Sequence, residues 1–102
     1  MQRRKARAKS ILKTKVVLLS GIIVEMKIWA VHGDSRFPDG FKYSLFAVFG
    51  SRVLVGYDNH HPKGHHRHVR SEEREYNFTT LEALKNDFKA DLEIELGREG
   101  LL

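Results

Sequence analysis

Five of the six histidines in this 102-residue chain lie within twelve consecutive residues, which read YDNHHPKGHHRH from Tyr57 to His68. Imidazoles bind metal ions, and because they titrate near neutral pH they also exchange protons with substrates. Two neighbours in the same stretch, Lys63 and Arg67, carry positive charges that suit phosphate oxygens. The stretch is therefore the first candidate for a chemical site.

A metal site is one interpretation of these histidines. Their neutral nitrogens suit zinc, nickel or copper, but Lys63 and Arg67 lie inside the cluster and repel a dication. His61 and His65 have the spacing of a helical His-x-x-x-His pair, yet a proline and a glycine lie between them. The chain has no cysteine, which excludes disulfides and thiolate metal sites. We therefore expect no physiological metal and no cofactor.

A nucleic-acid-binding site without catalysis is a second interpretation. Lys63, Arg67 and Arg70 can hold phosphates, Tyr57 can stack on a base, and Gly64 lets backbone amides approach an anion closely. The net charge of +5 agrees, and the first fifteen residues contain seven cations and no acid. A solvated loop with only turn-capping roles is the alternative that needs no function.

Cleavage of RNA through its own 2′-hydroxyl is a third interpretation, and it requires no metal. The reaction needs a base, an acid and a cation beside the phosphate, and His66, His68 and Arg67 supply these groups. In an extended segment, however, side chains alternate, so Arg67 would face away from both histidines unless the chain turns there. Asp58 is placed either to orient an imidazole or to cap the turn after the preceding strand.

The rest of the chain predicts an antiparallel β-meander. Four strands are expected, over residues 11–19, 22–31, 42–49 and 52–57. Ser20 and Gly21 have the length of a tight hairpin loop, and Gly50 is suited to the first position of a type II′ turn. Residues 32–41 are rich in turn formers and predict a longer connection.

A helix is predicted near the C-terminal end of the chain. Thr79, with Glu82 three residues later, has the pattern of a capping box, and Gly97 is the expected end. Apolar residues recur at helical spacing at Leu81, Leu84, Phe88 and Leu92. The expected fold is therefore α+β, a four-stranded antiparallel β-meander with a C-terminal helix packed on one face.

The chain has the length of a single domain, which we place at residues 11–97, with a basic N-terminal segment at 1–10 and a tail at 98–102. In a meander, the basic segment, the connection that contains Arg36 and the histidine-rich stretch share one end of the sheet, so we expect them to converge. No apolar run is long enough to cross a membrane, and the basic start lacks the apolar segment of a signal peptide. We expect a cytoplasmic protein with no membrane partner.

Four blocks of residues in the second half of the chain match a known pattern. They are Tyr57-Asp58-Asn59, Lys63-Gly64-x-His66-Arg67-His68, Tyr76-x-Phe78-Thr79-x-Leu81 and Asp87-Phe88-x-x-Asp91. In this combination the chain resembles the TumE family, toxin components of type II toxin–antitoxin systems. Residues 23–29 and 41–45 are similar to the second and third strands of that family, so the resemblance covers residues 11–95.

The resemblance implies a growth-inhibiting toxin, suspected of being a ribonuclease that acts on RNA, and a partner antitoxin that usually carries a helix-turn-helix domain. With the charge pattern, it gives candidate catalytic residues at His66, His68, Arg67, Asp58 and Tyr57, and candidate substrate-binding residues at Lys63, Gly64, Asn59 and Arg70. His60 and His61 fall outside the pattern, and many relatives have aspartate in place of His65. A non-enzymatic binding module and transfer of a nucleotidyl group remain alternatives.

Overall fold

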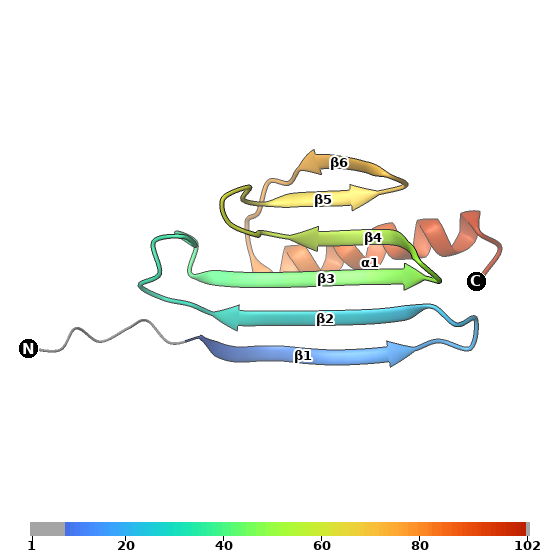
Figure 1. Ribbon diagram of the computed structural model, residues 1–102, viewed down its shortest axis with the longest axis horizontal. Helices are drawn as coiled ribbons and strands as arrows, with labels where there is room; N and C mark the ends of the chain where they lie inside the picture. The colour runs from blue at the N-terminus through green and yellow to red at the C-terminus, as the bar shows by residue number, and fades with distance from the viewer. Residues whose placement is uncertain (1–7, 102) are drawn as a thin grey trace, which may run out of the picture.

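The computed structural model describes residues 8–101. Six strands form one antiparallel sheet in chain order, and a single helix packs against one of its faces (Figure 1). The elements are β1 (Lys9–Val17), β2 (Ile23–Ala30), β3 (Phe41–Phe49), β4 (Arg52–Asp58), β5 (His66–Val69), β6 (Glu72–Glu75) and α1 (Leu81–Arg98). The α+β class, the antiparallel meander and the C-terminal helix are confirmed, whereas the prediction of four strands is wrong. Within residues 8–101, no helix is long and apolar enough to cross a membrane.

The two additional strands come from segments that lack an apolar alternation. β5 reads HRHV and β6 reads EERE, so burial of side chains does not reveal them as strands. Backbone pairing forms them instead, because β4 presents its free edge to β5, and β5 to β6. Arg70 and Ser71 join the two strands with φ of 49° and 66°, the left-handed values that a type I′ hairpin turn requires. The charged β6 then forms an edge that resists further pairing.

The core lies between the sheet and α1. Along β3, Tyr43, Leu45 and Ala47 are buried, while Lys42 and the other residues between them lie on the opposite face, as the two-residue period of a strand requires. The buried residues that complete this cluster are Ile22, Ile28, Leu54, Val55, Tyr57, Leu84 and Phe88. The predicted apolar stripe of the helix is confirmed, with Leu81 and Leu92 packed at its margins.

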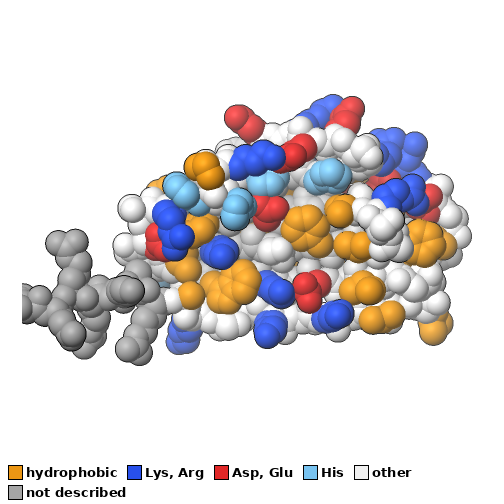
Figure 2. Space-filling model, in the orientation of Figure 1, with side chains coloured by type: hydrophobic (Ala, Val, Ile, Leu, Met, Phe, Trp, Pro, Cys, Tyr) orange, Lys and Arg blue, Asp and Glu red, His pale blue; other side chains and the backbone are white. Residues whose placement is uncertain are grey.

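The face of the sheet away from α1 carries no helix from the described part of the chain, and Figure 2 shows it in front. We call it the open face. Directly opposed residues on neighbouring strands form one row across it, in the order Lys13, Lys27, Ser44, Asp58, His66 and Glu75. Side chains that are distant in the sequence therefore lie side by side on this surface.

Both ends of α1 differ by a few residues from the prediction. Thr80 rather than Thr79 is the N-cap, and its hydroxyl accepts a hydrogen bond of 3.0 Å from the Ala83 N–H. The predicted capping box is wrong, because Glu82 is the second helical residue instead of the third. The helix also continues past Gly97. It ends in a Schellman motif in which Gly100 takes a φ of 70° and the Leu101 N–H donates to the Leu96 carbonyl at 2.8 Å.

The connections β2–β3 and β4–β5 meet at one end of the sheet, as predicted (Figure 1). A contact joins them directly, because Nε2 of His65 lies 2.6 Å from a carboxylate oxygen of Asp39. The predicted approach of the basic N-terminal segment falls mostly on residues 1–7, which lie outside the described residues.

The packing of α1 predicts a sharp contrast between two apolar residues on it. Phe88 is 2% exposed in the core, and Ile94 is 59% exposed. Phe88→Ala should lower the free energy of unfolding by about 3–5 kcal/mol, because it removes buried surface and leaves a cavity. Ile94→Ala should change it by less than about 0.5 kcal/mol. Urea unfolding followed by circular dichroism measures both, and equal effects would contradict this placement of the helix.

Candidate functional site

β5 divides the histidine-rich motif between the two faces of the sheet. His66 and His68 stand opposite Asp58 and Gly56 of β4 on the open face, whereas Arg67 stands opposite Tyr57 on the face toward α1. β5 is extended, so the turn that would bring Arg67 next to both histidines does not occur. The sequence-predicted catalytic residues therefore form two separate groups.

His66 is held by oxygen atoms at both ring nitrogens. Its Nδ1 lies 2.8 Å from the Gly64 carbonyl oxygen, and its Nε2 lies 3.1 Å from Oδ1 of Asp58 and 3.5 Å from Oε1 of Glu73. Asp58 also caps the turn after β4 by accepting a 3.0 Å hydrogen bond from the His60 N–H. Because carbonyl and carboxylate oxygens only accept, the imidazolium form of His66 has an acceptor for each of its two N–H groups.

A cation and a second histidine complete this group on the open face. The ammonium of Lys63 pairs with Glu73, and that hydrogen bond, together with the charges of Lys63, His66 and His68, lowers the pKa of the Glu73 carboxyl. His68 is half-buried and stands opposite Glu73 in the register of β5 and β6. We call Asp58, Lys63, His66, His68 and Glu73 the histidine cluster. Among residues 8–101, no group of three or more His, Cys, Asp or Glu side chains is arranged to hold a metal ion.

Arg67 and Tyr57 form a clamp with α1 on the other face. Nε and Nη2 of Arg67 lie 3.1 and 3.2 Å from the two carboxylate oxygens of Asp91, and the Tyr57 hydroxyl donates to the same carboxylate. Burial, and then the hydrogen bond to Asp91, raise the pKa of Tyr57, so its hydroxyl remains a donor. Tyr76 donates to Asp87 at 2.5 Å beside this clamp. These contacts tie β4, β5 and the helix together.

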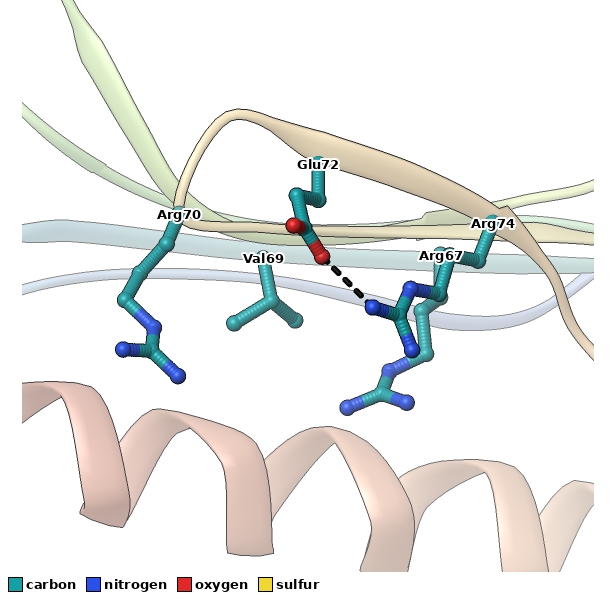
Figure 3. Close-up of a pocket in the computed structure, with 5 residues that line it drawn as sticks. All are labelled: Arg67, Val69, Arg70, Glu72 and Arg74. Atoms are coloured by element: carbon teal, nitrogen blue, oxygen red, sulfur yellow. Dashed lines mark hydrogen bonds and ion pairs between the residues drawn. The ribbon is translucent and has the colours of Figure 1, made fainter.

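A pocket of about 480 Å³ lies between the β5–β6 hairpin and α1 (Figure 3). Its lining residues are Arg67, Val69, Arg70, Glu72 and Arg74. Each of the three arginines has a carboxylate partner. Arg67 is paired with Asp91. Nε of Arg70 lies 3.2 Å from Oε1 of the buried Glu95, and Nη2 of Arg74 lies 2.8 Å from Oε2 of Glu72. An anion in this pocket would have to displace these partners, and the described lining contains no imidazole that could transfer a proton, so the pocket is a weaker candidate than the open face.

Asn59 and Gly64, two predicted substrate-binding residues, lie in the β4–β5 connection. Asn59 is 4% exposed, and its side chain accepts from the Tyr43 N–H at 2.9 Å and donates to the Phe41 carbonyl at 2.7 Å. Gly64 has a φ of 80°, which favours glycine, and its N–H donates to the His60 carbonyl at 3.0 Å. Both residues shape the loop that carries Lys63.

Two residues near the histidine cluster were not assigned a role by the sequence. Nδ1 of His65 lies 2.8 Å from the Tyr43 hydroxyl oxygen, and its ring stacks on Phe78 at 4.9 Å between centroids. Glu73 comes from a charged strand in which no sequence pattern distinguishes it from its neighbours. Only the register of β6 on β5 shows that Glu73 faces His66 and His68.

Residues 2–96 match the family model described as Toxin TumE. The match confirms the resemblance drawn from the motif blocks, and it covers both the histidine cluster and the clamp. It implies a toxin of a toxin–antitoxin system with an antitoxin as partner. No curated protein and no solved structure matches the chain.

The clamp predicts that Asp91 matters for stability although it lies far from the open face. Asp91→Ala should lower the free energy of unfolding by about 1–3 kcal/mol, because Tyr57 and Arg67 lose their shared acceptor. Glu93→Ala, at an exposed position of the same helix, is the control and should have almost no effect. Urea unfolding of the wild type and both variants measures these effects. If Asp91→Ala unfolds at the same urea concentration as Glu93→Ala, the clamp does not stabilise the fold.

Proposed function

Because the chain belongs to the TumE toxin family, we propose that it is a metal-independent endoribonuclease whose acid and base are histidines of the open face. The observation that carries this proposal is the placement of His66, paired with Asp58, beside His68 on a face that no described helix covers. Cleavage of RNA needs a proton acceptor and a proton donor, and in this proposal two imidazoles on one face of the sheet supply them.

The proposed reaction uses the RNA's own 2′-hydroxyl as the nucleophile. His68 accepts its proton, the 2′-oxygen forms a bond to phosphorus, and the bond from phosphorus to the 5′-oxygen breaks as His66 donates a proton to that oxygen. The products are a 2′,3′-cyclic phosphate and a 5′-hydroxyl. His66, whose ring Asp58 orients, is assigned as the acid, and His68 as the base. Lys63 stabilises the charge that develops on the phosphate oxygens.

The other candidate residues are assigned supporting roles in this chemistry. Asp58 orients His66 through the 3.1 Å contact with Nε2. Arg67 and Tyr57 act as positioning residues, because Asp91 holds them and their chain neighbours are His66 and Asp58. Arg70 lies in the β5–β6 turn and pairs with the buried Glu95, so contact with a phosphate would require this ion pair to open.

We also propose that the partner antitoxin carries a helix-turn-helix domain, which the family resemblance supports. An adjacent reading frame that encodes such a protein, and co-purification of the two products, would test this. An adjacent frame without such a domain would contradict it.

A non-enzymatic RNA-binding module is the alternative, supported by the lysines on β1, β2 and β3. Incubation of the purified protein with total RNA in EDTA separates the two functions. Salt-sensitive binding with no cleavage favours the binding module, whereas cleavage in EDTA favours the proposed enzyme. Activity that chelation abolishes and zinc or manganese restores would instead favour a metal enzyme.

Removal of either imidazole should abolish most of the activity. His66→Ala and His68→Ala should each lower the cleavage rate by about 10²- to 10⁴-fold, the usual contribution of a general acid or base. Both should also relieve growth arrest when expressed without antitoxin. His60→Ala is the matched control, because that side chain is exposed and only its backbone N–H contacts Asp58. Arrest by all three variants at the wild-type level would refute the assignment.

The role of Asp58 in orienting His66 gives a prediction for the kinetic constants of cleavage. Asp58→Asn keeps an oxygen that can cap the turn after β4 but removes the carboxylate that lies beside Nε2 of His66. We therefore expect kcat to fall while KM and the free energy of unfolding stay close to their wild-type values. Steady-state cleavage of an RNA oligonucleotide measures both constants. An unchanged kcat would show that Asp58 does not act through His66.

A further inference from the structure

The open face extends well beyond the histidine cluster, and we propose that its part over β1, β2 and β3 binds a single strand of RNA and leads it to that cluster. We call Lys13, Lys15, Lys27, Trp29 and Lys42 the lysine track. The inference rests on the proposed function, since it names where the substrate lies before cleavage, but its physical evidence is separate from the histidines.

The register of the sheet connects the lysine track to the histidine cluster. Lys13 stands opposite Lys27, and the same row continues through Ser44 and Asp58 to His66. Neighbouring strands are spaced by about 4.8 Å, so three steps place Lys27 roughly 14 Å from His66 along a continuous surface. Figure 2 shows Lys and Arg side chains across the lower half of this face and histidines above them.

Trp29 gives the track a surface on which a base can stack. It is half-buried on a face without a helix, and it stands opposite Lys42, whose ammonium lies 5.4 Å from the centroid of the indole ring. An aromatic ring beside a cation is the combination that holds unpaired nucleotides, because the ring stacks on a base while the cation contacts the phosphate. The bases of a duplex already stack on each other, so this pair favours a single strand.

The charge distribution also favours a polyanion in this place. Lys13 and Lys27 are directly opposed, and like charges at such positions destabilise a sheet. Strands β1, β2 and β3 contain one acidic residue, Glu25, whose carboxylate lies 3.4 Å from the ammonium of Lys27. The other lysines of these strands therefore give the surface an excess of positive charge. At the other edge, β6 is mainly acidic. RNA is therefore attracted over β1 to β3 and repelled beyond the histidines, which places its scissile phosphate near β5.

The test measures binding without cleavage, using a single-stranded oligonucleotide with 2′-O-methyl sugars, which lacks the nucleophile. Trp29→Ala should weaken binding by roughly 5- to 150-fold, the range for loss of one stacked base. The double variant Lys13→Gln and Lys27→Gln should make the slope of log affinity against log salt less steep by roughly 1.4, because two phosphate contacts are lost. Lys85→Gln combined with Lys89→Gln, at exposed positions of α1, is the matched control and should leave the slope unchanged.

The outcomes distinguish this inference from the proposed function. Both open-face variants are first checked for folding by circular dichroism. If they bind the oligonucleotide with wild-type affinity and salt slope, the proposed role of the lysine track is wrong, even if the protein cleaves RNA. Equal affinity for a duplex would overturn the preference for a single strand. Loss of antitoxin binding with unchanged RNA binding would identify the face as a protein interface instead. Track-dependent binding without any cleavage of natural RNA would support the track and refute the proposed ribonuclease.

Discussion

The two-residue period of β5 is the constraint on which the arrangement of this protein depends. Pairing with β4 fixes which face each side chain takes, and Arg67 faces α1 because Asp91 accepts from its guanidinium there. A shift of register by one residue would direct both neighbouring histidines toward the core and the guanidinium toward water. The ion pair with Asp91 opposes such a shift, because the carboxylate, whose side chain is 15% exposed, would then lose a charged partner.

The same constraint gives the two faces different chemistry. On the side of α1, the cations that the structure describes around the pocket are matched by carboxylates, which satisfies charged groups that have partly lost contact with water. The open face has lysines, two imidazoles and an indole that the fold does not need for its core. The core therefore lies on one side of the sheet, and the other side presents the side chains of the proposed site.

The sequence predicted those parts of the fold in which burial determines the residue types. Strands β1 to β4 are rich in apolar and β-branched residues, and the stripe on α1 recurs at helical spacing, so these elements were found to within a few residues. β5 and β6 were not found, because backbone pairing and a left-handed turn at Arg70 and Ser71 form them. The sequence favoured Thr79 as the N-cap because Glu82 follows it three residues later, whereas the structure begins the helix after Thr80. Glu73 was missed because its contact depends on a strand that was itself missed.

Adjacent residues of the motif blocks divide between the two faces of the sheet. In each of the pairs Tyr57-Asp58 and His66-Arg67, one residue joins the clamp under the sheet and its neighbour joins the histidine cluster above it. Since Asp91 fixes the clamp residues, it also fixes the backbone from which the cluster residues project. The 3.1 Å contact between Asp58 and His66 is thus set by an interaction on the opposite face, and preorganisation of the site and cohesion of the fold have the same physical origin.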